Sequence, residues 1–235
     1  MTANKIHLLS PEIVEQIYNL QSWISKLPQY NLENSKKITK SLEKEADRHS
    51  VNIEYPNQRV NKRQLRKEVL EAAKYFAEKY QKELSHNIIM GSWQKIMGQN
   101  CSSYRNGGFC MASGMNYFYP NNVLDQMDSF FINNSSLDTF LEKALHSHFH
   151  LTRIHPFNDG NGRLARLVQN GILKKGELPP IVISKFDRRN YFDLLNSAQR
   201  SYDSNEGKMT SEQAKFYNYL GMSLWDSLNR LKKKL

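Results

Sequence analysis

One run of residues combines the side chains that the handling of a polyphosphate requires. It reads His155-Pro156-Phe157-Asn158-Asp159-Gly160-Asn161-Gly162-Arg163-Leu164-Ala165-Arg166. The histidine has an ordinary pKa near neutrality, which suits a general base. The aspartate is the type of ligand through which proteins hold Mg²⁺ against phosphate oxygens. The sequence therefore predicts phosphate chemistry at this run.

The glycines and arginines of the run point to the same chemistry. Gly160 and Gly162 permit backbone conformations and close approaches that a side chain would prevent. Successive backbone N–H groups can then face an anion at the start of a helix. Arg163 and Arg166 are three residues apart, so on a helix they project from one side, and their guanidinium groups match phosphate geometry. An ordinary surface turn would explain the glycines but not the histidine and arginines at these offsets.

The run resembles the signature of the Fic family, H-x-F-x-[D/E]-G-N-G-R-x-x-R, at every fixed position. The likeness extends from about Ser50 to about Arg200. Residues 145–154 are similar to the helix before the Fic loop, and residues 176–180 and 189–194 to the turn and helix that follow it. The resemblance implies an all-α fold, a Fic-type helical bundle with one short β-hairpin flap near the active site.

The resemblance also implies an activity. A protein adenylyltransferase of this type transfers AMP from ATP to a Ser, Thr or Tyr hydroxyl of a target protein. His155 would take the hydroxyl proton, and Asp159 would hold Mg²⁺ on the α- and β-phosphates. The implied catalytic residues are His155, Asp159, Asn161 and Arg163. The implied nucleotide contacts are Gly160, Asn161, Gly162, Arg163, Arg166, Tyr191 and Gln199, the last two on the adenine side.

A second motif lies nearer the N-terminus. Ser50-Val51-Asn52-Ile53-Glu54 resembles the inhibitory motif of class II Fic proteins, [S/T]-x-x-x-E-[G/N]. By that resemblance Glu54 would pair with Arg166 and displace the ATP γ-phosphate, because a carboxylate occupies the same guanidinium donors as a phosphate. Tyr55 stands where the family has Gly or Asn, residues that tolerate a left-handed helix end. A different helix end could shift Glu54 and weaken the inhibition.

Several alternatives remain open at this point. Thr39–Glu43 and Ser41–Glu45 also have the Ser/Thr-x-x-x-Glu spacing, and Glu54 is preferred for its distance to the next helix pattern. The same site could instead hydrolyse AMP from modified proteins, do both reactions, or transfer another nucleotide such as UMP. A DNA-binding regulator is disfavoured, because one amphipathic helix and a short tail follow Tyr202, rather than a winged helix.

The periodicity of apolar residues predicts an almost entirely helical chain. Asn61, Ser85 and Thr210 are expected N-caps, the last within a capping box formed by residues 210–213. A hairpin is expected over residues 109–119. Expected helices cover residues 10–27, 33–54, 61 onward, 85–98, 122–131, 137–153, the segment after the motif, 187–202 and 210 onward. We expect N-terminal helices over 1–60, a catalytic core over 61–205 and a C-terminal helix over 206–235, in one compact unit.

Composition limits the remaining possibilities. The net charge is +10 and the pI about 9.5, but the basic residues are spread along helical stretches, so nucleic acid is not favoured as a partner. Cys101 and Cys110 suit a reducing compartment, and no apolar stretch reaches membrane-spanning length. We expect a cytoplasmic protein, or one exported without a cleaved signal, with ATP and an unknown target protein as partners. Self-modification and a homodimer stay open, and a zinc site among His146, His148, His150 and His155 is disfavoured.

Overall fold

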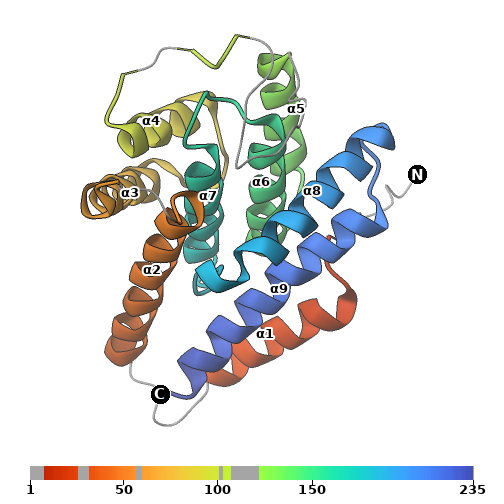
Figure 1. Cartoon of the computed structure of the whole chain (residues 1–235). Coiled ribbons are helices and arrows are strands. Elements are labelled where there is room, and N and C mark those ends of the chain that lie inside the picture. The colour runs from red at the N-terminus through yellow and green to blue at the C-terminus, as the bar shows by residue number, and fades with distance from the viewer. Residues whose placement is uncertain (1–7, 26–31, 57–59, 101–102, 107–121, 235) are drawn as a thin grey trace. The chain divides into compact units, whose positions relative to one another are not determined.

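Helices make up nearly all of the regular structure in the part of the chain that the computed structural model describes, which is residues 8–25, 32–56, 60–100, 103–106 and 122–234. Figure 1 shows their course. Their bounds are α1 Pro11–Ser25, α2 Leu32–Glu54, α3 Lys62–Lys79, α4 His86–Met97, α5 Val123–Ser135, α6 Phe140–Ile154, α7 Asn161–Lys175, the 3₁₀ helix η1 Lys185–Asp187, α8 Arg188–Ser204 and α9 Ser211–Lys232.

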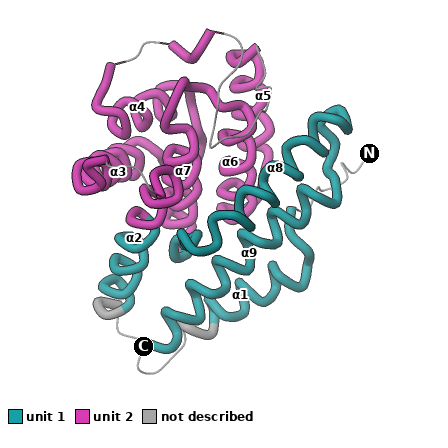
Figure 2. Tube along the Cα trace, in the orientation of Figure 1, with its two compact units in different colours: residues 1–46, 178–235 teal, residues 47–177 magenta. Residues whose placement is uncertain are grey.

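The chain divides into two compact units, coloured separately in Figure 2. Residues 47–177 form one unit, which contains the last residues of α2 and helices α3 to α7. Residues 1–46 and 178–235 form the other, which contains α1, most of α2, α8 and α9. The division at residues 60 and 205 expected from the sequence stays a prediction.

Helix α6 is the most buried element of the 47–177 unit. It packs against α5 and α7, and α7 in turn packs against α3 and α4. Twelve of the fifteen residues of α6 are buried, so the helix has no solvated face. Three of these buried residues are histidines, which lie close to other polar groups. The His148 ring nitrogen Nδ1 is 2.5 Å from Gln169 Oε1, and the rings of His146 and His150 are 4.2 Å apart.

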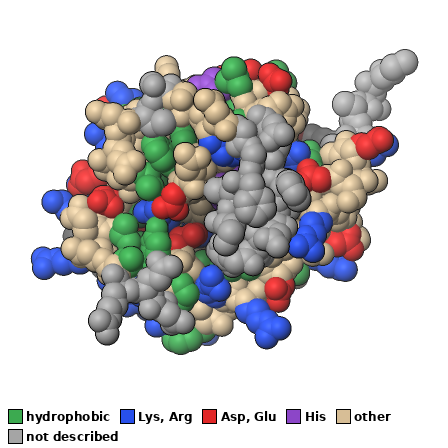
Figure 3. Space-filling model, turned by 45° about the horizontal axis from the view of Figure 1, so that its top comes forward, with side chains coloured by type: hydrophobic (Ala, Val, Ile, Leu, Met, Phe, Trp, Pro, Cys, Tyr) green, Lys and Arg blue, Asp and Glu red, His purple; other side chains and the backbone are tan. Residues whose placement is uncertain are grey.

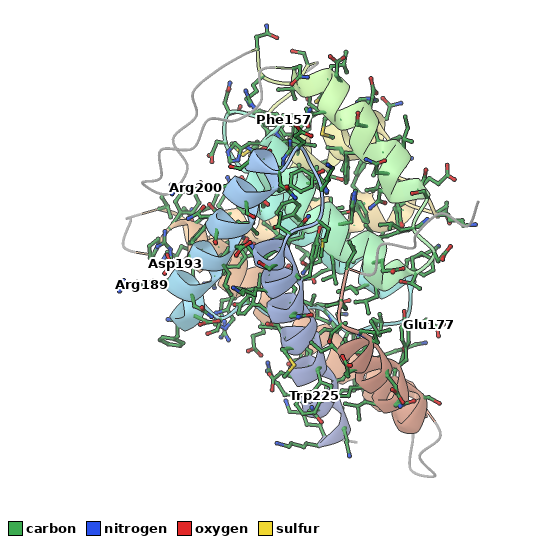
Figure 4. The ribbon with its side chains drawn as sticks, turned by 90° about the vertical axis from the view of Figure 1, so that its right-hand side faces the viewer. Phe157, Glu177, Arg189, Asp193, Arg200 and Trp225 are labelled. Carbon is green, nitrogen blue, oxygen red and sulfur yellow. The ribbon has the colours of Figure 1, made fainter. Side chains whose placement is uncertain are left out.

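Helix α9 organises the other unit. It packs against α1 and α8. Its buried apolar residues recur at intervals of three or four, which places them on one helical face: Phe216, Leu220, Leu224, Leu228 and Leu231. On α8, Arg189 and Asp193 lie one turn apart on the outward side (Figure 4) with their charged groups 3.7 Å apart, an exposed pair that adds little stability.

The predicted helices and caps agree with the structure at most positions. Asn61 and Ser85 accept hydrogen bonds from the third residue of α3 and α4, at Gln64 N and Ile88 N. Helix α4 ends at Gly98 in the left-handed conformation. Helix α5 runs beyond its predicted end at residue 131 because the buried Asn134 side chain donates hydrogen bonds across to Lys143 O and Ser147 Oγ.

The capping box predicted at residues 210–213 is wrong in one half. Thr210 Oγ1 accepts from Gln213 N as expected, but the Gln213 side chain bonds Tyr217 rather than the cap backbone. A complete box is present instead at the start of α6, where Thr139 and Glu142 bond each other's backbone N–H. The predicted hairpin at 109–119 and both cysteines lie outside the described residues.

The described surface bears on two of the expectations about partners. None of the described helices is both long enough and apolar enough to cross a bilayer. On the face shown in Figure 3, Lys and Arg side chains are interspersed with acidic and uncharged ones. Such a mixture differs from the continuous basic patch that typifies nucleic-acid-binding surfaces.

Candidate active site

The predicted catalytic run forms the connection between the two helices α6 and α7. His155 is the C-cap of α6, with φ of 53° and its N–H bonded to Leu151 O at 3.1 Å. Gly160 is the N-cap of α7, with φ of 80°. The histidine, the aspartate and the start of α7 are therefore held by the ends of two packed helices. Such rigid support suits a site whose chemistry depends on positioning.

Arg105 closes the end of α6 from another segment of the chain. Its backbone N–H donates to Pro156 O at 2.9 Å, and its guanidinium donates to His155 O at 2.6 Å and Ile154 O at 3.0 Å. Carbonyls at a helix C-terminus lack intrahelical partners, so this side chain satisfies them and orients the residue that carries the imidazole. Only the fold brings Arg105, which is buried, to this position.

The interior of the loop is fixed by Asn161, Phe157 and Trp93. Asn161 Oδ1 accepts from Phe157 N at 2.9 Å, and Asn161 Nδ2 donates to Phe157 O at 2.6 Å. Phe157, which lies at this end of the helices in Figure 4, is buried and stacks on Trp93 with ring centroids 4.4 Å apart. Trp93 Nε1 donates to Asp159 O at 2.7 Å. Because that carbonyl is held by Trp93, the backbone at the turn into α7 has a defined direction.

The two glycines of the run meet different constraints. Gly160 needs its left-handed backbone, and a Cβ there would come within 2.8 Å of Met97 Sδ. Gly162 has ordinary helical geometry, but a Cβ on it would overlap Glu54 Oε1. A carboxylate thus rests directly on the first turn of α7, where the helix dipole and exposed N–H groups favour an anion.

The His155 imidazole is neutral at physiological pH. Its ring is only partly exposed, and burial lowers its pKa to about 4, with a bond to the Thr152 carbonyl opposing the shift and Arg105 adding to it. His155 Nδ1 lies 3.4 Å from Thr152 O, and a carbonyl can only accept, so the proton of the neutral ring belongs on Nδ1. The lone pair is then on Nε2, as a general base requires.

Arg166 is bonded to both ends of the predicted inhibitory motif. Its Nη2 donates to Glu54 Oε1 at 2.6 Å, and its Nε donates to Ser50 Oγ at 2.8 Å. The Arg166 side chain is 6% exposed and that of Glu54 is 22% exposed. A partly desolvated charge pair of this length is stronger than a surface ion pair. Helix α2 continues to Glu54, so Tyr55 at the next position does not displace the carboxylate from Arg166.

Asp159 and Arg163 lie together beside the end of α2. Arg163 Nη2 is 3.5 Å from Asp159 Oδ2, 3.3 Å from Met97 Sδ and 3.2 Å from the Tyr55 hydroxyl. Burial raises the pKa of Tyr55, and the nearby Arg163 charge opposes that shift, so the hydroxyl remains a hydrogen-bond donor at neutral pH. The Asp159 side chain is 62% exposed. One accessible carboxylate fits the usual protein contribution to a phosphate-bound Mg²⁺.

The structure brings together most of the predicted site residues, but not all within one unit. His155 to Arg166, Ser50 and Glu54 all belong to the 47–177 unit. Tyr191 and Gln199, predicted from family position, are buried residues of α8 in the other unit. Their role toward adenine stays a prediction. Within the described residues, no group of three or more His, Cys, Asp or Glu side chains is arranged to hold a metal ion.

Three side chains of this site carry no motif that sequence reasoning could have used. They are Trp93, Met97 and Arg105, which act on the run through contacts 50 to 66 residues away in sequence. The spacing of Trp93 and Met97, one turn apart on α4, is a weak signal of a shared face but says nothing about what that face contacts.

Replacing Ser50 by alanine tests the hold on Arg166. We expect Ser50→Ala to tighten ATP binding about 3- to 10-fold. The variant loses the hydrogen bond from Arg166 Nε to Ser50 Oγ, which favours the arrangement seen here, and keeps the contact between Arg166 and Glu54. Isothermal titration with ATP measures the effect. Ser41→Ala, an exposed serine of the same helix, is the matched control. Equal affinities in both variants would remove Ser50 from the inhibitory contact.

Comparison with known proteins places this geometry in a family. The Fic/DOC family model matches residues 66–173, which include the whole run from His155 to Arg166. This segment belongs to the Fic/DOC family. A relative named protein adenylyltransferase Fic, from Nematostella vectensis, is 50% identical over 58 residues, which are 25% of this chain and 14% of that protein. The chain thus matches only a small part of the length of such relatives.

Solved structures share the fold across a much larger part of the chain. A Fic-domain-containing signalling protein from Bacteroides thetaiotaomicron has a TM-score of 0.77 at 23% identity, over 93% of this chain and 97% of that one. A fragment of Fic-1 from C. elegans has a TM-score of 0.75 at 18% identity, over 94% and 71%. At these identities the similarity establishes the Fic-type helical fold alone.

Proposed function

We propose that this protein is an adenylyltransferase that moves AMP from ATP to a Ser, Thr or Tyr hydroxyl of a target protein, and that Glu54 inhibits it. The observation that carries the proposal is the position of the Glu54 carboxylate. It lies on Arg166 and against Gly162, at the N-terminus of α7. An anion bound by a guanidinium and a helix N-terminus marks a position suited to a phosphate group.

The proposed reaction forms a bond between the acceptor oxygen and the α-phosphorus, and breaks the bond from that phosphorus to the bridging oxygen of pyrophosphate. His155 Nε2 takes the proton of the acceptor hydroxyl. Its lowered pKa supports this role, because the ring is already unprotonated when the substrate arrives. Most of the remaining catalysis is positioning and charge neutralisation, as in other phosphoryl-type transfers.

In this proposal the other site residues contact different parts of the nucleotide. Arg163 and Arg166 neutralise the β- and γ-phosphates, and the backbone from Gly160 to Gly162 faces the α-phosphate. Asn161 keeps that backbone in place through its two bonds to Phe157 and stabilises the charge that develops there. On the adenine side, Tyr191 and Gln199 are proposed contacts.

Asp159 is the proposed ligand of Mg²⁺. Bound there, Mg²⁺ would neutralise charge on the substrate phosphates, and pyrophosphate would then be a better leaving group. The exposed carboxylate suits this task. Asp159 Oδ1 already accepts from Gly160 N at 2.6 Å, which orients the carboxylate relative to the phosphate-facing backbone.

The name of the related proteins supports AMP as the group transferred, since the relative from Nematostella vectensis is a protein adenylyltransferase. The retained Gly160-Asn161-Gly162 sequence also favours nucleotidyl transfer over kinase-like or phosphocholine-transferring variants of the family. Because the match covers a small part of that relative, the target protein, self-modification and a homodimer all stay proposals for this chain.

Labelling with α-³²P-ATP and Mg²⁺ tests the proposal. We expect Glu54→Gly to label itself and a lysate protein strongly and the native protein to label weakly, since the substitution empties the phosphate position on Arg166. Glu43→Gly is the matched control, because it makes the same change on the same helix, at a rival position of the inhibitory motif. It should behave as the native protein does.

Each other outcome has a distinct meaning. Equal labelling of native protein and Glu54→Gly would contradict inhibition by Glu54 and leave the transfer reaction standing. Labelling by α-³²P-UTP in place of ATP would change the nucleotide. Absence of labelling, together with release of AMP from an adenylylated protein, would replace transfer by hydrolysis at the same site.

A further inference from the structure

The Tyr55 hydroxyl occupies the cation side of the proposed site. It donates to Asp159 Oδ2 at 3.4 Å and accepts from Arg163 Nη2 at 3.2 Å. The Arg163 guanidinium carbon also lies 5.5 Å from the centre of the Tyr55 ring. One side chain thus contacts both the carboxylate proposed for Mg²⁺ and an arginine proposed for phosphate.

Glu54 and Tyr55 are adjacent in sequence but contact different groups. The Tyr55 N–H still bonds Val51 O at 3.1 Å, so its backbone follows the last turn of α2. From that turn Glu54 extends to Arg166, whereas Tyr55 extends to Asp159 and Arg163. The end of α2 therefore touches the catalytic run at two separate places.

We propose that Tyr55 is a second inhibitory residue, which blocks cation and phosphate binding at Asp159 and Arg163 independently of Glu54. This inference rests on the proposed function, and it assigns a role to the position at which the chain departs from the inhibitory motif of its family. Glu54 excludes the outer phosphate, and Tyr55 excludes the metal-bound part of the nucleotide.

The chemistry of the contact explains why it must break. The hydroxyl proton of Tyr55 points at Asp159 Oδ2, and a divalent cation on that oxygen would face the same proton. The other oxygen of Asp159 is already bonded to Gly160 N. Arg163 Nη2 would likewise have to leave the hydroxyl to reach a phosphate. Metal-bound nucleotide and the Tyr55 contacts therefore exclude each other, and the contacts favour the blocked state.

Glu54→Gly is the background in which an independent effect of Tyr55 can be seen. In the Glu54→Gly variant we expect Tyr55→Phe to lower the Mg²⁺ concentration for half-maximal ATP binding about 3- to 10-fold. The phenyl ring keeps the packing of Tyr55, but the hydroxyl and both of its hydrogen bonds are lost. Isothermal titration with ATP at a series of Mg²⁺ concentrations measures this without turnover. Tyr75→Phe is the matched control and should change nothing, because Tyr75 lies on α3 and its hydroxyl bonds Asn87 O on α4, away from the run.

The binding readout separates this inference from the proposed function. An unchanged Mg²⁺ dependence in the double variant would overturn it. So would an effect of Tyr55→Phe seen only when Glu54 is present, because Tyr55 would then act through Glu54. Tighter Mg²⁺-dependent ATP binding without any transfer of label would support the Tyr55 contact and contradict the transferase. Thermal melting of each variant confirms that the proteins compared are folded.

Discussion

Replacing His155 by alanine in the Glu54→Gly background should lower AMP transfer by about 10²- to 10⁴-fold and leave ATP affinity nearly unchanged. This is the usual contribution of a positioned general base. In the proposed reaction the ring acts on the transition state through Nε2, whereas phosphate binding is assigned to Arg163, Arg166 and the start of α7. Initial rates of label transfer and a separate titration with ATP measure the two quantities.

The pH dependence of the same reaction gives a sharper test of His155. Its pKa is lowered to about 4, so above about pH 5 the imidazole is neutral, which is the form that the proposed general base requires. In the Glu54→Gly enzyme we expect kcat/KM to stay level from pH 8 to about pH 5.5, because the His155 ring of the free enzyme takes up no proton in that range. The Glu54 carboxylate raises the pKa of His155. Its removal in this variant therefore lowers that pKa further and strengthens the expectation.

Two results would contradict the assignment. One is a fall in kcat/KM centred near pH 6.5, the ordinary value for histidine. The other is retention of transfer by His155→Ala. The control is His86→Ala, since His86 belongs to the same unit but bonds Tyr104 and Asp128 rather than any residue of the run. It should retain transfer.

The second large effect is a loss of stability in weak acid. Burial lowers the pKa of His146 and His148 to about 3, and that of His150 well below its usual value. These rings stay neutral in the folded protein but become protonated on unfolding at any pH below about 6.5. The stability that they contribute is therefore complete above pH 6.5 and is lost as the pH falls from there toward 3.

The size of the effect follows from proton linkage. At pH 5, His146 and His148 each reduce the free energy of unfolding by about 2 kcal/mol relative to neutral pH, and His150 acts in the same direction. Since whole domains are stable by about 5–15 kcal/mol, we expect a large drop. Urea unfolding followed by circular dichroism at pH 7.5 and pH 5 measures it.

A variant ties the effect to a named ring. His148→Gln removes one titrating group from α6. The variant should therefore take up about one proton fewer on unfolding in weak acid, and its free energy of unfolding should depend less steeply on pH. Its stability at pH 7.5 is compared separately, because the bond to Gln169 also changes. Equal stability of the native protein at the two pH values would show that the buried histidines are not the source of acid sensitivity.

The local parts of this structure could be predicted from the sequence. Asn61 and Ser85 cap their helices as the residue types indicate, and Gly98 ends α4. Such signals lie within a few residues of the element that they define, so no tertiary information is needed. The prediction failed at residues 210–213, where Gln213 found a partner in Tyr217 and left the capping box half formed. There the buried hydrogen bond to Tyr217 replaced the local bond between the Gln213 side chain and the cap backbone.

The order and spacing of the reactive residues can be read directly from the chain: a histidine, a carboxylate, two glycines and two arginines at offsets that only a loop and a helix start can use together. The chain also contains the Ser50-to-Glu54 motif, which its distance to the next helix pattern favours over the two rival placements. Only the tertiary structure brought Glu54 to Arg166, 112 residues away, and Arg105 to His155, 50 residues away.

The same holds for Tyr55, whose departure from the family motif suggested a weaker hold but whose hydroxyl contacts Asp159, 104 residues away. The physical reason is that helix caps and turns depend on neighbours in the chain, whereas a contact between distant side chains depends on which helix faces pack together. Apolar periodicity shows that a face is buried without naming its partner. Packing alone therefore decided which carboxylate and which hydroxyl lie in the proposed phosphate site.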